Sequence, residues 1–321
     1  SISREQLEQR IESAQQQGME TEQARRELEH LAEREALGDI HIAVFGEISS
    51  GKSSLLQALL PGARLETGVV GGTTRGIRCY RWENELNLPL VLVDMPGLNE
   101  QAGTLSGVSR DEMARSHIAL FLVDGDLTAD QYASLRTVVD FGKPCILVLN
   151  KADLFNQQEL ERLLGRLRER VSKFNDSRSG ARVEVVAARA GGTREITRLL
   201  PDGSEQQTTR PRDPDLGELQ NTLRQLLKQY SSSELEGLRR NAVLSLVWQQ
   251  LDQQQVKFRR QRSADLVKSS TGKAVIAALA TVSPGTDLVV QGYLGFSMVQ
   301  ALCRLYQVPV SDLEIQQLLK R

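Results

Sequence analysis

The segment Gly46–Ser53 constrains the fold of this chain more than any other part of the sequence. It matches the pattern GxxxxGK[ST], follows an apolar run over 41–45 and opens a helical stretch over 53–60. In that setting the backbone N–H groups of the loop and the helix N-terminus converge on phosphate groups. The Lys52 ammonium would neutralise phosphate oxygens, and the Ser53 hydroxyl would bind Mg²⁺. The sequence therefore predicts a strand, a phosphate-binding loop and a helix in that order.

Further apolar runs continue this pattern along the chain, with helical stretches between them. The runs cover residues 41–45, 88–93, 118–123, 144–149 and 183–186. Near-continuous apolar runs separated by helices are typical of buried parallel strands in a doubly wound α/β sheet. The more polar stretch 76–82 predicts an edge strand that turns at 83–87 into the next run. We therefore expect an α/β domain, a mostly parallel sheet with helices on both faces, joined to an all-α C-terminal domain.

Composition excludes several other classes of protein. The chain has 40 Lys and Arg against 41 Asp and Glu, and aromatic residues make up only 4%. It therefore gives no signal for direct nucleic-acid binding through stacking platforms. Three widely spaced cysteines, Cys79, Cys145 and Cys303, together with three histidines, predict neither a disulfide framework nor a zinc site. Residues 1–40 lack a long apolar run, so we expect no signal peptide and a cytoplasmic protein.

Two further segments supply groups for the phosphate end of a nucleotide. The segment Asp94–Gly97 matches DxxG at the end of a predicted strand, where ligand-binding loops of open α/β sheets lie. Asp94 would hold Mg²⁺ through a water molecule, and the Gly97 N–H would approach the γ-phosphate. Thr74, in the glycine-containing stretch 71–75, has a hydroxyl that would close on Mg²⁺ when a third phosphate is present, and a plain glycine turn is the alternative. The predicted metal ligands are Ser53, Thr74 and Asp94.

The segment Asn150–Asp153 matches NKxD directly after another predicted strand and indicates recognition of a base. The Asp153 carboxylate would accept the N1–H and N2–H₂ donors of guanine, while Asn150 donates to N7 and the Lys151 stem covers the ring. Adenine lacks these donors in that arrangement, and each unpaired polar group costs roughly 1–3 kcal/mol. The Ala188 N–H would bind guanine O6. The candidate nucleotide-binding residues are Gly46, Glu47, Ile48, Ser49, Ser50, Gly51, Lys52, Ser53, Ser54, Gly97, Asn150, Lys151, Asp153, Ala188 and Arg189.

With four motifs in this order, residues 40 to about 190 resemble the Era/TrmE-like branch of translation-factor-related P-loop GTPases. The resemblance implies an enzyme that hydrolyses GTP to GDP and phosphate with Mg²⁺. It also implies that Thr74 is the switch threonine and that Asp94–Gly97 is the second switch. Unaided hydrolysis should be slow, because Leu98 stands where Ras-like relatives place a water-orienting Gln.

The loop departs from the potassium-activated members of that branch, which have Asn at the position of Ser49. Here the sequence is similar to the P-loop of dynamin-like GTPases, whose serine at this position serves catalysis and cation binding. Arg75, beside the switch, would act as a charge donor in cis or across a dimer, and an exposed arginine without that role is the alternative. The candidate catalytic residues are Lys52, Thr74, Ser49 and Arg75.

The remaining sequence predicts helices. We expect an N-terminal segment over 1–38 with two short helices, a GTPase domain over 39–213, and a helical domain over 214–321. Turn-forming glycines and prolines predict a hairpin at about 191–213 that decorates the GTPase domain.

An apolar stretch over 274–303 contains a single charged residue, Asp287, beside a Ser-Pro-Gly break, and it follows a basic stretch over 257–268. Each of its arms is shorter than the ~20 residues that span a bilayer. Three interpretations fit: a buried helical hairpin, a homodimer interface, or shallow insertion into an anionic membrane surface. The third also rests on a resemblance to the helical domain of some bacterial membrane-associated GTPases.

These features suggest three functions. The first is a nucleotide-dependent switch whose helical domain engages a protein partner or a second copy of the chain. The second is a dynamin-like membrane-associated GTPase, peripheral at the inner face of a membrane, that uses the apolar hairpin. The third, with the least support in the sequence, is a ribosome-assembly GTPase, because no GXXG-type RNA-binding loop follows the motifs.

Overall fold

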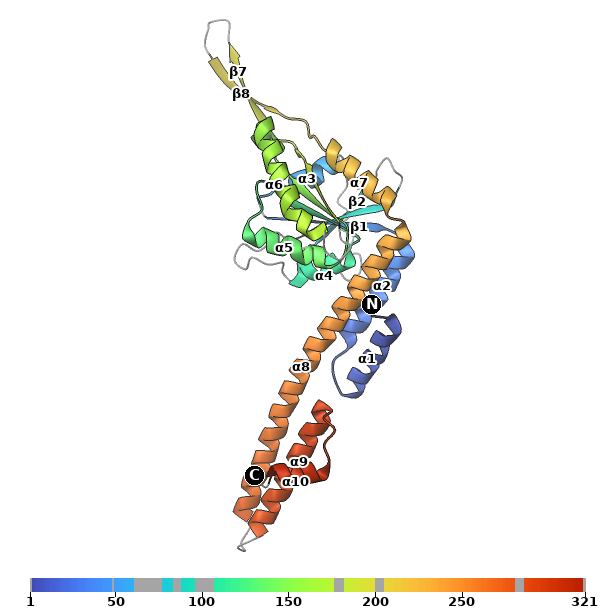
Figure 1. The fold of residues 1–321 in the computed structure, drawn as a ribbon, viewed down its shortest axis with the longest axis vertical. Coiled ribbons are helices and arrows are strands. Elements are labelled where there is room, and N and C mark those ends of the chain that lie inside the picture. The colour runs from blue at the N-terminus through green and yellow to red at the C-terminus, as the bar shows by residue number, and fades with distance from the viewer. Residues whose placement is uncertain are drawn as a thin grey trace. The chain divides into compact units, whose positions relative to one another are not determined.

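The computed structural model of the chain describes residues 2–47, 49–60, 77–82, 88–95, 107–175, 182–199, 205–280 and 286–319 (Figure 1).

A six-stranded sheet forms the centre of the phosphate-loop region. Its strands are β1 (Ile40–Gly46), β2 (Arg78–Trp82), β3 (Leu90–Asp94), β4 (Ile118–Val123), β5 (Cys145–Leu149) and β6 (Val183–Ala187). They lie in the order β2-β3-β1-β4-β5-β6. All neighbours pair in parallel except β2, which pairs antiparallel with β3 at the edge. The predicted mostly parallel α/β sheet and its polar edge strand are confirmed.

Helices cover both faces of this sheet. They are α3 (Lys52–Leu59), α4 (Gly107–Arg115), α5 (Ala129–Asp140), the short 3₁₀ turn η1 (Ala152–Leu154), α6 (Gln157–Asn175) and α7 (Gly217–Gln229). Because successive strand residues point to opposite faces, β1 contributes to two cores. Ala43 and Phe45 lie in the core shared with α4, α5 and α6, whereas Ile42 and Val44 lie in the core shared with α3 and α7. Burial on both faces explains why the central strands are almost wholly apolar.

The predicted hairpin is present. Strands β7 (Thr193–Leu199) and β8 (Glu205–Pro211) pair antiparallel, from Thr193 opposite Pro211 to Leu199 opposite Glu205. The two strands form a separate two-stranded sheet. At its base, Arg212 N–H donates to the Gly192 carbonyl at 2.8 Å, which returns the chain to the end of β6.

Helices dominate the rest of the described chain. They are α1 (Arg4–Gln16), α2 (Glu22–Leu37), α8 (Ser232–Ala280), α9 (Thr286–Tyr306) and α10 (Asp312–Leu319). The two helices predicted in 1–38 are therefore confirmed. At the start of α8 the Glu234 carboxylate accepts from the Ser231 N–H at 2.8 Å, and the Ser231 hydroxyl accepts from the Glu234 N–H at 3.2 Å, as in a capping box.

By internal contacts the chain divides into two compact units, which we name here. The sheet unit comprises residues 1–4 and 25–247, and the helical unit comprises residues 5–24 and 248–321. This division differs from the boundaries predicted after 38 and 213. The sheet unit includes most of α2, all of α7 and the first turns of α8. Ion pairs and apolar side chains hold these helices against the rest of the unit. In the helical unit, Arg10 of α1 pairs with Asp252 and lies 3.9 Å from the ring centre of Trp248.

The apolar stretch 274–303 forms the end of α8 and most of α9. Five of its large apolar side chains face solvent: Val275, Ile276, Leu279, Val289 and Tyr293 are 54–83% exposed. Others, among them Val290, Leu294 and Phe296, are half-buried. The interpretation of this stretch as a buried helical core is therefore wrong for the five exposed side chains. Among the described residues, none of the helices has an apolar segment long enough to cross a bilayer.

Candidate nucleotide site

The phosphate-binding loop leaves β1 at Gly46 and enters α3 at Lys52. Gly51 precedes the helix with φ of 84°, a left-handed conformation that side chains rarely adopt. A Cβ atom there would lie 2.4 Å from the Asn150 amide nitrogen, so both the conformation and the space require glycine. The Ser50 N–H and hydroxyl both donate to the Glu47 carbonyl, at 3.1 and 2.8 Å, and close the loop into a turn. Ser49, Ser53 and Ser54 are exposed at the loop and the first turn of α3.

The Lys52 ammonium lies over this loop. Its Nζ donates to the Gly46 carbonyl at 2.9 Å and the Glu47 carbonyl at 3.4 Å, and the residue is buried. Burial lowers the pKa of Lys52, and the nearby Asp94 carboxylate counteracts that shift. An ammonium has three donors, and these two carbonyls engage two of them. A phosphate oxygen would be a fitting third partner.

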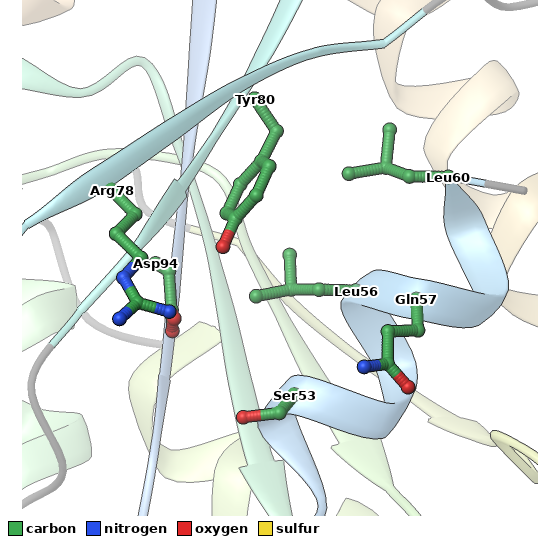
Figure 2. Close-up of a pocket in the computed structure, with 7 residues that line it drawn as sticks. All are labelled: Ser53, Leu56, Gln57, Leu60, Arg78, Tyr80 and Asp94. Carbon is green, nitrogen blue, oxygen red and sulfur yellow. The ribbon is translucent and has the colours of Figure 1, made fainter. Parts of the chain in front are cut away.

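A pocket of about 280 Å³ adjoins the first turns of α3 (Figure 2). It is lined by Ser53, Leu56, Gln57, Leu60, Arg78, Tyr80 and Asp94. Figure 2 shows the Ser53 hydroxyl and the Asp94 carboxylate directed into the same space, with the Arg78 guanidinium beside Asp94. Burial raises the pKa of Asp94, whereas the charges of Lys52 and Arg78 lower it. The end of β3 thus brings a carboxylate close to Ser53 and Lys52, and its role toward Mg²⁺ stays a prediction.

These oxygen donors fit Mg²⁺. A hydroxyl and a carboxylate are hard ligands, and Mg²⁺ in phosphate sites takes one or two protein ligands together with phosphate oxygens and water. No group of three or more His, Cys, Asp or Glu side chains among the described residues is arranged to hold a metal alone. Ser53 and Asp94 are described residues that would contribute oxygen ligands to such an ion beside a bound phosphate.

The base motif contacts the phosphate loop directly. Asn150 is 1% exposed, and its Nδ2 donates to the Ser50 carbonyl at 2.9 Å. Its Oδ1 is buried and has no hydrogen-bond partner within the part of the chain that the structure describes. One N–H of this amide group thus joins the two halves of the site. The group has a second N–H, so the contact of Asn150 with guanine N7 stays a prediction. Lys151 has φ of 56°, and its Nζ donates to Asp124 Oδ2 at 2.9 Å, which holds its stem.

Asp153 and Ala188 have partners that the sequence did not predict. Asp153 Oδ2 accepts from Arg212 Nη1 at 3.1 Å. The Ala188 N–H, which we expected to bind guanine O6, donates to the Leu149 carbonyl at 2.8 Å, because the β5–β6 ladder extends one residue further. The Arg189 N–H likewise donates to the Asp215 carbonyl at 3.0 Å. Binding of O6 by Ala188 therefore requires its bond to Leu149 to open or to be shared.

Several predicted site residues lie outside the described residues, so the structure gives no account of them. They are Ile48, Thr74, Arg75, Gly97 and the departure at Leu98. Sequence reasoning in turn missed Arg78, Asp124 and Arg212, which contact or adjoin motif residues. None of these three belongs to a motif, and no local pattern marks them.

Residues 41–151 match the family model described as 50S ribosome-binding GTPase. The chain is 34% identical over 120 residues to the tRNA modification GTPase MnmE of Desulfotalea psychrophila, covering 36% of this chain and 25% of that protein. It is 32% identical over 126 residues to GTPase Der of Akkermansia muciniphila, covering 36% of this chain and 27% of that protein. The structure of a bacterial selenocysteine-specific elongation factor aligns with a TM-score of 0.42 at 18% identity, covering 60% of this chain and 29% of that one.

The chain spans about a quarter of the length of the two curated relatives named above. The family model spans the residues of this chain that carry the phosphate loop, the Asp94 motif and the start of the base motif. Over residues 41–151 this chain is therefore similar to the 50S ribosome-binding GTPases, and its sheet has the fold of a P-loop GTPase domain.

Proposed function

We propose that this chain binds guanine nucleotides and hydrolyses GTP to GDP and phosphate as a nucleotide-dependent switch. The observation that carries the proposal is the 2.9 Å hydrogen bond from Asn150 to the Ser50 carbonyl. It fixes the base motif against the phosphate loop, so a single nucleotide can contact both. Specificity for guanine then depends on Asp153, whose two carboxylate oxygens match the two adjacent donors of that base.

In this proposal, Lys52 and the N–H groups of the loop hold the phosphates. Ser53 and Thr74 are the protein ligands of Mg²⁺ in the GTP state, and Asp94 supports the ion through water. When bound, Mg²⁺ would neutralise charge that develops on the phosphate oxygens. Ser49 is exposed on the loop, where its hydroxyl is free to approach the nucleotide. Ser49 and Arg75 remain proposed catalytic groups on the strength of the sequence.

Lys52→Ala tests this proposal. The variant lacks the ammonium that neutralises the phosphates, so we expect it to lose GTP binding and turnover. Lys173→Ala, which removes an exposed lysine of α6, is the matched control and should behave as the unchanged chain. GTP affinity measured by titration calorimetry and phosphate release measured with a coupled assay give the two readouts. Full GTP affinity in Lys52→Ala would contradict the assignment of the loop.

Two clusters of buried polar side chains support a route from the nucleotide site to α8. Helix α4 follows the proposed second switch in the sequence, and its Glu112 pairs with Arg34 of α2 at 3.4 Å and with Arg115 at 3.0 Å. Beside it, His117 Nε2 lies 3.0 Å from Glu236 of α8, which also pairs with Arg239 at 2.7 Å. Buried pairs have few alternative arrangements, so a shift of α4 would alter the seating of α8. The helical unit would then report the nucleotide state to a protein partner or a second copy.

A second candidate function is peripheral binding to an anionic membrane. It is favoured by the exposed side chains of Val275, Ile276, Leu279, Val289 and Tyr293, which lie beyond the basic stretch 257–268 of α8. Exposed apolar patches of this kind mark interaction sites, and basic helices bind anionic headgroups. Co-sedimentation with liposomes rich in phosphatidylserine, with GDP and with a non-hydrolysable GTP analogue, tests it. Pelleting that persists in Leu279→Asp would contradict this role for the hairpin.

A third candidate is ribosome assembly, which only the description of the matching family favours. Co-sedimentation of the full chain with ribosomal subunits, in GDP and in the GTP analogue, would test it. A chain that stays free of the subunits with either nucleotide would contradict this function.

A further inference from the structure

Arg212 is a charged group at the base site that belongs to none of the sequence motifs. Its Nη1 lies 3.1 Å from Asp153 Oδ2, and the side chain of Asp153 is 14% exposed. The two residues are 59 positions apart in the sequence. This contact places a guanidinium on the carboxylate that the proposed function assigns to reading guanine.

Backbone hydrogen bonds hold Arg212 and the neighbour of Asp153, Ala152, to the same segment, residues 188–192. The Arg212 N–H donates to the Gly192 carbonyl at 2.8 Å, and the Ala152 N–H donates to the Ala188 carbonyl at 3.1 Å. Gly192 has φ of +134°, and a Cβ there would lie 3.8 Å from Asp153 Oδ2. The backbone at Gly192 therefore lies close to the Asp153 carboxylate, and Arg212 contacts Asp153 from a fixed position at the base of the β7–β8 hairpin.

The Asp153 carboxylate has enough acceptor sites to bind guanine and Arg212 at the same time. An ionised carboxylate has about four lone-pair sites, two on each oxygen. Arg212 engages one site on Oδ2, and guanine would need one site on each oxygen for its N1–H and N2–H₂ donors. Three bonds therefore fit on one carboxylate, and the arginine restricts rotation of the group about its Cβ–Cγ bond.

We propose that Arg212 is a positioning residue that orients the Asp153 carboxylate for bidentate recognition of guanine. The inference rests on the proposed function, because it assumes that Asp153 reads the base. A free carboxylate samples orientations in which only one oxygen meets the base, whereas the held group presents both. Arg212 should thus favour the base with two adjacent donors over the base with one.

Nucleotides that differ by a single donor test this role. Inosine diphosphate keeps the N1–H of guanine but lacks the N2 amino group. We expect Arg212→Gln to raise the Kd of GDP about tenfold and that of inosine diphosphate about threefold, so preference for GDP falls about threefold. Arg212→Lys keeps one charged donor and should restore most of the preference. Arg182→Gln, at an exposed arginine paired with Glu184 near the start of β6, is the control and should change neither affinity.

The outcomes separate this inference from the function on which it rests. An unchanged ratio of the two affinities in Arg212→Gln, with both weakened alike, would show a purely structural role and overturn the proposal. Tighter GDP binding in the variant would also overturn it, because Arg212 would then compete with guanine. If the unchanged chain binds GDP no better than ADP, the proposed function itself fails, whatever the variants do.

Discussion

Substitution of Gly51 by alanine tests how closely the two halves of the site are joined. The added methyl group would lie 2.4 Å from Asn150 Nδ2, well inside van der Waals contact. Alanine is also strained at a φ of 84° by about 1–2 kcal/mol. To make room, Asn150 must move and lose its bond to the Ser50 carbonyl, which contributes about 0.5–1.5 kcal/mol.

Together these effects amount to about 1.5–3.5 kcal/mol, which corresponds to roughly 10-fold to 400-fold in affinity if the bound state bears the whole cost. We therefore expect Gly51→Ala to weaken GDP binding by about two orders of magnitude, measured by titration calorimetry. Gly125→Ala is the matched control, because a Cβ at Gly125 meets no described atom within 4 Å. Thermal unfolding of both variants separates loss of binding from loss of fold. If Gly51→Ala binds GDP as tightly as the control, the steric reasoning is refuted.

Two further predictions concern the buried polar groups of the sheet unit. Lys143 is fully buried, and its ammonium donates to the carbonyls of Met113, Ala114 and Ser116. Lys143→Met leaves these acceptors without their donor and should lower the free energy of unfolding by about 2–4 kcal/mol in urea titrations. If Lys143→Met lowered the free energy of unfolding by less than the exposed-site variant Lys173→Ala does, this prediction would be contradicted. Burial holds the pKa of His41 at about 3, so the folded chain keeps it neutral while the unfolded chain protonates it near its ordinary value of 6.5. Stability should therefore fall as the pH drops from 6.5 toward 3, by up to about 1.4 kcal/mol per pH unit from this group. His41→Gln should flatten that dependence, and an unchanged slope would show that His41 does not carry it.

The sheet could be predicted from the sequence because its signals are local. Each parallel strand is an apolar run such as 118–123, and the phosphate loop and helix α3 follow from the pattern that begins at Gly46. The β7–β8 hairpin was predictable because its turn residues and its two flanks lie within one short stretch. Local patterns of this kind specify elements and their order well.

Pairings between distant residues could not be predicted in the same way. The contact of Arg212 with Asp153 depends on where the chain returns after the hairpin, and the engagement of the Ala188 N–H depends on how far the β5–β6 ladder runs. The exposed apolar side chains at the end of α8 show the same limit. Composition marks them as apolar, but only the packing of the neighbouring helices decides whether they are covered.

The central claim is that Asp153 reads guanine within a site that also holds the phosphates. Binding of GDP and xanthosine diphosphate to the unchanged chain and to Asp153→Asn, measured side by side by calorimetry, tests it most directly. The amide offers a donor where the carboxylate offered an acceptor, so the variant should lose GDP affinity and gain affinity for the xanthine nucleotide, whose ring carries a carbonyl at that position. A variant that keeps full affinity for GDP and gains none for xanthosine diphosphate would contradict the account.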